Sequence, residues 1–455
     1  MSKPSIPKGT RDFTPTVMAR RQWIFDTIRA SFQARGFQPI ETPALENLST
    51  LTGKYGEEGD QLIFKVLNNG DFLAKVHEDD LAERDSKKVG FQISKKALRY
   101  DLTVPFARFV AMHRNELQLP FKRFQIQTVW RGDRPGRGRY QEFTQCDADI
   151  IGSEGLLNEL ELIELFHEAL GALGLPNVEI HINDRRVLTG FADFCGVADR
   201  LTDLTVCIDK FDKVGVDGVI NELGIRGFDA DVQSAVRVLF SIEGEGLQAM
   251  DALERTFVHP AISEGLSDLR QLWAWSADRG IVSPELRFSP GLARGLDYYT
   301  GAIFEVRIGG SPVGSICGGG RYADLTGIFG WKGVSGVGIS FGADRIYDVI
   351  EHFEAFPEAA TCSTDVLVMH MGDETLDASL AAAAQLRAAG QIVEMYPDPS
   401  KLKKQFKYAD DRGIEWAIVI GSDEHAAGKL TLRHMPTSEQ QVVEISQACD
   451  RLTSI

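Results

Sequence analysis

The chain has 455 residues, of which 43% are hydrophobic and 25% charged, and this composition is typical of a globular protein with two or three domains. Its net charge of −16 means that a nucleic-acid partner would have to bind at a local basic patch. Because the chain has no long apolar run, it predicts no membrane span and no secretory signal. Its six cysteines are scattered and form no C-x-x-C pair, so neither a zinc site nor a disulfide framework is expected. Free thiols fit a reducing, cytoplasmic location.

The first predicted element is an amphipathic helix over residues 17–35, because apolar residues recur there at four-residue spacing. Gly36 follows it as a helix-terminating glycine. Residues 37–45 read as extended, and Pro39 and Pro43 place this segment at a sheet edge or an interface. Short strands or turns are expected further along, at residues 62–67, at 90–93 and near 98.

Residues 131–145 form the most informative segment, with four arginines between two strand-like runs, 124–130 and 141–150. Two glycines and a proline interrupt the segment, which therefore predicts a β-hairpin with a long loop. Guanidinium groups bind phosphate oxygens in a bidentate manner, and clustered arginines repel one another unless an anion is present. The segment thus indicates a phosphate site, with an ordinary solvated loop as the alternative.

The second strand of this hairpin carries an unusual face, because residues two apart in a strand point the same way. The face consists of an aromatic ring, an amide and two carboxylates: Phe143, Gln145, Asp147 and Asp149. Such a face suits a polar ligand pocket with a stacking platform better than it suits a core. The earlier run from Arg99 to Thr103 also combines an arginine, an acid and a hydroxyl, although a surface turn explains it equally well.

The middle of the chain predicts a helix from Ser153 to residue 173 and a half-buried strand over residues 178–182. His181 lies on the other face of that strand, where an exposed or polar environment is the simplest interpretation. Residues 184–285 are mostly helical in pattern and resemble an inserted helical subdomain without readable chemistry.

Strand patterns return at residues 286–288 and 302–308, before a glycine-dense stretch. Gly318–Gly320 fits a flexible loop, a weak phosphate cradle, or a place where a ligand approaches the backbone. Residues 336–345 read as a strand that feeds a helix, with Arg345 in its first turn. An arginine there either binds an anion beside the helix N-terminus or forms a structural salt bridge.

Beyond a linker at residues 351–363, strands and helices alternate, which predicts a separate C-terminal α/β domain of roughly 90 residues. The expected strands are 365–370, 392–396 and 416–420, and the expected helices are 376–389 and 400–412. Lys403 and Lys407 share one face of the second helix and offer a basic patch or a merely solvated face. The N-terminal part lacks this alternation, and we expect an antiparallel sheet with flanking helices there.

Taken together, these segments resemble the class II aminoacyl-tRNA synthetases. The long helix with Pro43 is similar to motif 1 of that class, residues 131–145 to motif 2, and residues 336–345 to motif 3. LARGLDYY at 292–299 and ICGGGRYADL at 316–325 look like two peptides peculiar to the histidyl-tRNA synthetase family, and KGTRDF at 8–13 resembles the start of that family.

The resemblance implies an α+β catalytic domain over residues 1–355, with a six-stranded antiparallel sheet and a helical insertion at about 185–285. It implies a C-terminal α/β anticodon-binding domain over 364–455 and a homodimer built through motif 1. The implied activity is that of a histidine–tRNA ligase, which uses ATP with Mg²⁺ to convert L-histidine to histidyl-adenylate and then charges the 3′ end of the histidine tRNA. No side-chain cluster for a metal is expected.

The resemblance also implies roles for individual residues. Arg131 and Arg294 would be catalytic, as fixed guanidinium groups that stabilise charge on the α-phosphate without proton transfer. The ATP-binding set would be Arg131, Asp133, Arg139, Phe143 and Arg345. The histidine-binding set would be Asp101, Thr103, Arg131, Gln145, Asp149, Arg294, Tyr298 and Tyr299. Asp101 and Asp149 are aspartates where some family members have glutamate.

A rival interpretation is a non-catalytic paralogue that serves as a regulatory, histidine-sensing subunit of ATP phosphoribosyltransferase. Such paralogues usually lack the C-terminal domain and some of the arginines, whereas residues 365–445 and all three key arginines are present here. A prolyl or threonyl synthetase is disfavoured by LARGLDYY and by the lack of cysteine–histidine zinc spacing.

Overall fold

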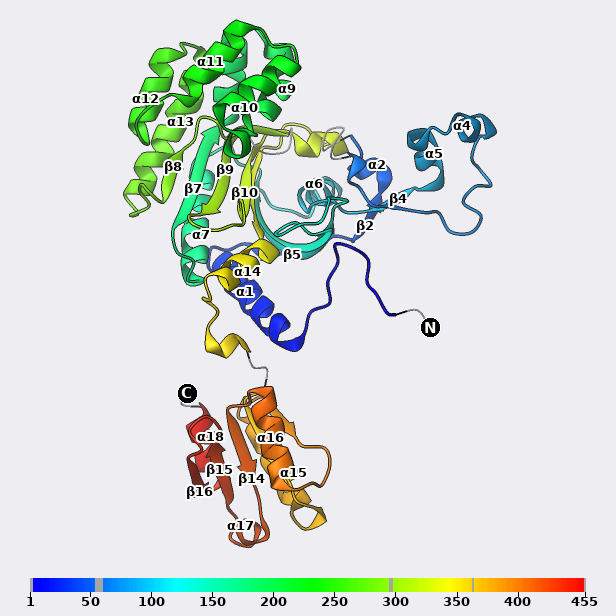
Figure 1. Cartoon of the computed structure of the whole chain (residues 1–455), viewed down its shortest axis with the longest axis vertical. Helices are drawn as coiled ribbons and strands as arrows, with labels where there is room; N and C mark the ends of the chain where they lie inside the picture. The colour runs from blue at the N-terminus through cyan, green and yellow to red at the C-terminus, as the bar shows by residue number, and fades with distance from the viewer. Residues whose placement is uncertain (1–2, 54–59, 294–297, 362–363, 454–455) are drawn as a thin grey trace. The chain divides into compact units, whose positions relative to one another are not determined.

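The computed structural model describes residues 3–53, 60–293, 298–361 and 364–453 (Figure 1). The chain divides into two compact units, one of Met1–Arg11 with Ile24–Ala355 and one of Asp12–Trp23 with Phe356–Ile455. Within the described ranges, no helix is long and apolar enough to cross a membrane.

The first unit is built on an eight-stranded sheet with the order β1-β5-β6-β11-β10-β9-β7-β8. The six central strands, β5 to β7 in this order, pair with one another in antiparallel fashion. The edge strands β1 and β8 pair in parallel with β5 and β7. The strands are β1 Gln38–Pro39, β5 Phe121–Trp130, β6 Glu142–Ile151, β7 Val178–Asp184, β8 Leu286–Phe288, β9 Tyr299–Ile308, β10 Cys317–Tyr322 and β11 Gly336–Gly342. The expected six-stranded antiparallel sheet is therefore confirmed, and the two parallel edge strands are an addition.

Helices cover one face of this sheet and bury its apolar side chains. Phe32 of α1 (Pro15–Ala34) packs against Phe124 of β5 and Phe341 of β11, with ring centroids 5.4 and 5.8 Å apart. Phe166 of α7 (Leu157–Ala172) lies 5.3 Å from the same Phe341 ring. Aromatic pairs at these separations add to the hydrophobic burial that holds α1 and α7 on the sheet.

Two local predictions in this unit are wrong. The helix expected from Ser153 begins at Leu157, because the Ser153 hydroxyl is used in the preceding turn, where it accepts from the Asn158 side chain at 2.9 Å. The strand or turn expected at residues 90–93 belongs to helix α5 (Ser86–Ile93). Asp85 caps that helix by accepting from the backbone amides of the two following lysines.

A small sheet and several short helices flank the large sheet on the side of α6 (Figure 1). Its strand order is β2-β4-β3. The elements are β2 Leu45–Asn47, β3 Lys65–Val66, β4 Lys96–Leu98, α2 Leu48–Leu51, α4 Glu78–Glu83 and α6 Thr103–Met112. The run from Arg99 to Thr103 joins β4 to α6 and lies beside the hairpin.

The predicted helical insertion is present between β7 and β8, in the green part of Figure 1. It contains α8 Arg185–Phe194, a 3₁₀ turn Ala198–Arg200, α9 Leu201–Ile208, α10 Phe211–Ile225, α11 Ala230–Phe240, α12 Leu247–Thr256 and α13 Pro260–Ala277. His181 of β7 is half-buried, and its Nδ1 lies 2.7 Å from the Ser289 hydroxyl. The polar environment expected for His181 is therefore confirmed.

The second unit has a five-stranded sheet with the order β13-β12-β14-β15-β16. The predicted strands and helices are present as β12 Val366–Met369, α15 Asp373–Ala388, β13 Val393–Met395, α16 Leu402–Arg412 and β14 Trp416–Val419. The sequence did not predict the remaining elements, α17 Ser422–Ala426, β15 Leu430–His434, β16 Gln440–Val443 and α18 Ile445–Thr453. The first three strands are parallel, as a βαβαβ order requires, and β15 and β16 extend them antiparallel.

Gly318–Gly320 do not form a flexible loop, because they lie inside β10 between β9 and β11. A methyl group added at Gly319 would lie 2.2 Å from the carbonyl oxygen of Gly338, and one at Gly320 would lie 2.7 Å from that of Ala302. The glycines therefore allow close backbone approach in the middle of the sheet. After β11, α14 (Ala343–His352) begins directly, as predicted.

We predict that Gly319→Ala lowers the free energy of unfolding by about 1–3 kcal/mol, because the added methyl group overlaps backbone atoms that cannot move without distorting β11. Urea denaturation measures the effect. Gly314→Ala is the matched control, because a methyl group there meets nothing within 4 Å. Equal stability of the two variants would contradict the close packing of β10 and β11.

Candidate active site

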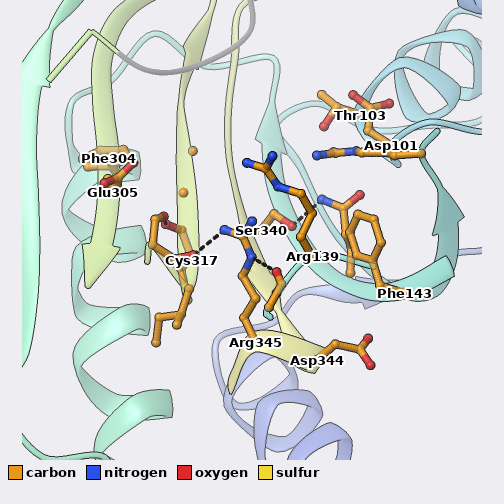
Figure 2. Close-up of a pocket in the computed structure, with 18 of the residues that line it drawn as sticks. Asp101, Thr103, Arg139, Phe143, Phe304, Glu305, Cys317, Ser340, Asp344 and Arg345 are labelled. Atoms are coloured by element: carbon orange, nitrogen blue, oxygen red, sulfur yellow. Dashed lines mark hydrogen bonds between the residues drawn. The ribbon is translucent and has the colours of Figure 1, made fainter. Parts of the chain in front are cut away.

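A cavity of about 380 Å³ opens above the glycine-rich central strands of the large sheet (Figure 2). Among the residues predicted for a site, those that line it are Asp101, Thr103, Arg131, Asp133, Arg139, Phe143, Gln145, Tyr298, Tyr299 and Arg345. These residues come from the segment before α6, the arginine hairpin, β6, the start of β9 and the first turn of α14. Segments that are far apart in the sequence are thus brought to one cavity. Arg294 lies outside the described residues.

Arg131 follows β5 and is held between aromatic rings at the cavity wall. Its Nε donates to the carbonyl oxygen of Tyr100 at 3.1 Å. Its guanidinium carbon lies 4.3 Å from the ring centroid of Tyr100 and 5.3 Å from that of Phe143. These contacts fix the plane of the guanidinium group.

The hairpin loop closes tightly at its tip. Gly136 and Arg139 exchange two backbone hydrogen bonds of 3.0 Å each, and Gly138 supplies the positive φ of 65° that the turn needs. The exposed side chain of Arg139 lines the cavity, whereas those of Arg134 and Arg137 do not. The predicted arginine-rich hairpin is therefore confirmed. Of Arg134, Arg137 and Arg139, Arg139 alone lines the cavity.

Arg345 lies in the first turn of α14, beside Arg139 and the tip of the hairpin loop (Figure 2). Its Nε donates to the carbonyl oxygen of Gly138 at 2.8 Å, and its Nη1 donates to that of Ser315 at 2.6 Å. These two carbonyls fix the guanidinium group beside a helix N-terminus, where the backbone amides also favour an anion.

The floor of the cavity covers a buried cluster of charged side chains, in which Asp101, Asp147 and Asp149 are each 2% exposed and Arg123 is 0% exposed. Arg123 Nη2 lies 2.6 Å from Asp149 Oδ2. Burial raises the pKa of Asp147 to about 7, although Arg123 opposes the shift. Burial also raises the pKa of Asp149, again against the effect of Arg123. Three carboxylates beside one guanidinium make this end of the cavity suited to a cation.

Asp149 does not line the cavity, unlike the other described residues of the predicted site. Its Oδ1 accepts from the Tyr322 hydroxyl at 2.8 Å, and its Oδ2 pairs with Arg123. The side chains on the predicted shared face of β6 therefore lie at two depths. Phe143 and Gln145 reach the cavity, whereas Asp149 lies beneath the cavity wall.

Several lining residues escaped the sequence interpretation: Tyr140, Phe304, Glu305, Ser315, Cys317, Ser340 and Asp344. Asp344 forms an ion pair with Arg11 and accepts from the backbone amide of Thr144 at 2.8 Å. Burial raises the pKa of Tyr140 to about 12, and a hydrogen bond from its hydroxyl to Asp348 adds to the shift. For Ser340, the sequence carries a signal in its residue pattern, because Ser340 is the polar residue among apolar ones in β11.

Comparisons with known proteins agree on one family. A family model described as histidyl-tRNA synthetase matches residues 85–346, and an anticodon-binding domain model matches residues 365–455. The chain is 48% identical to a Porphyromonas gingivalis protein named histidine–tRNA ligase over 98% of both chains, and 47% identical to one from Cytophaga hutchinsonii over 99% and 100%. A crystal structure of histidyl-tRNA synthetase from a Nostoc species superimposes with a TM-score of 0.84 at 29% identity, over 100% of both chains.

We predict that Asp149→Ala destabilises the first unit by roughly 3–5 kcal/mol, because it leaves the guanidinium of Arg123 buried without its carboxylate. Thermal or urea unfolding measures this change. The double variant Arg123→Met with Asp149→Ala should regain part of the loss, since it removes the uncompensated charge. A single variant as stable as the wild type would contradict the importance of this pair.

Proposed function

Because this chain belongs to the histidyl-tRNA synthetase family, we propose that it is a histidine–tRNA ligase, which activates L-histidine with ATP and transfers the histidyl group to the 3′ end of the histidine tRNA. The observation that carries this proposal is the cavity itself. It joins fixed guanidinium groups at its walls to buried carboxylates at its floor, and these two ends complement the phosphates of ATP and the ammonium group of an amino acid.

The guanidinium end would bind the nucleotide. Arg131 would contact the α-phosphate and the substrate carboxylate, and Arg139 and Arg345 would contact the other phosphates. Phe143 would stack under the adenine ring, with Asp133 beside it. The carboxylate of histidine then attacks the α-phosphorus and pyrophosphate leaves. This step needs no general base, because fixed positive charges stabilise the charge that develops on the phosphate oxygens.

The acidic end would bind histidine. Asp101, Thr103 and Gln145 supply a carboxylate and neutral acceptors, which match an ammonium group with three donors. Tyr298 and Tyr299 would lie against the imidazole ring. Because the carboxylate of Asp149 is bonded to Arg123 and Tyr322, we assign Asp149 a role through Tyr299 and Tyr322, whose pKa values are raised by burial and also by the charge of Asp149.

Further features of the family are proposed for this chain on the same basis. Mg²⁺ would enter with ATP as a counter-ion of the phosphates, and the described residues contain no cluster of three His, Cys, Asp or Glu side chains for a metal. We also propose a catalytic domain over residues 1–355, an anticodon-binding domain over 364–455, a homodimer formed through the motif 1 region, and a cytoplasmic location.

The regulatory-subunit alternative is not favoured. The matched relatives named histidine–tRNA ligase correspond to the chain over almost its whole length. The anticodon-binding model also matches residues 365–455, which fits a protein that binds tRNA.

The proposal is tested by ATP–pyrophosphate exchange with each amino acid in turn, and we expect exchange with histidine alone. Arg294→Ala should slow that exchange by about 10²–10³-fold, because one preorganised donor to the developing charge is lost. Arg287→Ala is the matched control, since Arg287 lies outside the cavity, where it pairs with Glu179. Exchange with another amino acid, or none, would contradict the function. A wild-type rate in Arg294→Ala would contradict the role of that residue.

We predict that Lys403→Glu combined with Lys407→Glu raises the Michaelis constant for tRNA severalfold, and less strongly at high salt, because both exposed lysines lie on α16 of the second unit. Aminoacylation at two salt concentrations measures the effect. Histidine-dependent exchange serves as the internal control and should stay unchanged. Unaltered charging of tRNA by the double variant would rule out this face as an RNA contact.

A further inference from the structure

Three polar side chains of the neighbouring strands β6 and β11 lie in a row that begins at the cavity wall. Gln145 of β6 donates from Nε2 to the hydroxyl of Ser340 in β11 at 2.9 Å (Figure 2). Ser340 lies directly opposite Asp147 in the β6–β11 pair, so the two side chains share one face of the sheet, and the hydroxyl favours the charged form of the carboxyl. The row therefore runs from the cavity wall at Gln145 to the buried carboxylate of Asp147.

Two acceptor atoms in this row are buried and have no hydrogen-bond partner among the described residues, namely Gln145 Oε1 and Asp147 Oδ1. Gln145 is 9% exposed and lines the cavity. Leaving a buried acceptor unpaired is unfavourable, so an acceptor of this kind in a cavity-lining residue, here Gln145 Oε1, indicates a ligand that donates hydrogen bonds. An ammonium group is a ligand of that kind.

The direction of the hydrogen bonds in this row follows from the number of hydrogens available. A serine hydroxyl has one hydrogen, and an ionised carboxylate can only accept it. Once Ser340 donates to Asp147, its oxygen can only accept from Gln145, which turns the NH₂ end of the amide toward Ser340 and the carbonyl end away from it. The opposite orientation would present amide hydrogens to a bound cation.

We propose that Ser340 and Asp147 are positioning residues that hold the carbonyl oxygen of Gln145 toward the cavity, and that they thereby determine recognition of the α-ammonium group of histidine. This inference rests on the proposed function, since it concerns the amino-acid end of the same site. Neither residue takes part in the chemical step. Their effect on the ligand passes through the amide of Gln145.

The charge of Asp147 controls this row. The groups that face it are Arg123 from β5, Asp149 from β6, Asp101 before α6, Arg99 after β4 and Tyr299 from β9. Burial raises the pKa of Asp147 to about 7, so its carboxyl is partly protonated near neutral pH. A protonated carboxyl can itself donate to Ser340, and the amide then loses its fixed direction. Ammonium binding therefore strengthens as pH rises through about 7.

The first test compares two ligands in Ser340→Ala. Calorimetry measures the dissociation constants of histidine and of 3-(imidazol-4-yl)propanoate, which lacks only the amino group. We expect histidine to bind about tenfold more weakly and the propanoate to change less than twofold, because a hydrogen bond to a charged group is worth about 1.5–3 kcal/mol. Ser340→Thr keeps the hydroxyl and should restore most of the affinity. Equal weakening of both ligands would show a merely structural role and overturn the proposal.

The second test uses Asp147→Asn, which keeps the shape of the side chain and removes its charge. Between pH 6 and 8, wild-type protein should gain affinity for histidine more steeply than for the propanoate, and this difference should vanish in the variant. The propanoate corrects for titration of the imidazole ring, which both ligands share. A pH profile that Asp147→Asn leaves unchanged would overturn the proposal.

Failure of this inference can be separated from failure of the proposed function. Wild-type protein without histidine-dependent pyrophosphate exchange would refute the function. Normal exchange, together with an unchanged ratio of the two dissociation constants in both variants, would refute the positioning role alone.

Discussion

The buried ion pair between Arg123 and Asp149 constrains how the strands of the first unit pair beneath the cavity. The two residues face each other across β5 and β6, so the pair forms only in the observed register. A shift of one residue would move every side chain of β6 to the other face. Because Tyr322 also bonds Asp149, the same pair links β6 to β10. The cavity floor therefore rests on a charge arrangement that tolerates little change.

This arrangement gives the cavity two electrically different ends. Arg131, Arg139 and Arg345 come from the hairpin and α14, and the backbone holds two of them in place. The carboxylates lie at the other end, where burial raises the pKa values of Asp147 and Asp149. A molecule that joins a phosphate group to an amino-acid ammonium group satisfies both ends at once, as histidyl-adenylate would.

The sequence predicted the parts of the fold whose signals are local. The hairpin followed from its arginines and turn residues, and β11 with α14 followed from a strand pattern that runs into a helix. Long-range pairing left no such signal. The parallel pairing of the expected strands β1 and β8, the β15–β16 hairpin and the placement of Gly318–Gly320 inside a strand were therefore not predicted. The sequence likewise carries no signal for an ion pair between two strands. Nothing in the sequence marks Arg123 as the partner of a buried carboxylate. The sequence places Asp149 in the cavity, whereas Arg123 and Tyr322 hold it below the wall.

The central claim is that the acidic end of the cavity receives the ammonium group of histidine. A crystal structure of this chain with L-histidine bound tests it most directly. We expect the α-ammonium nitrogen within hydrogen-bonding distance of Gln145 Oε1 and the Asp101 carboxylate, with the imidazole ring beside Tyr298 and Tyr299. Histidine bound with its ammonium group at the arginine end, or outside the cavity, would contradict the account.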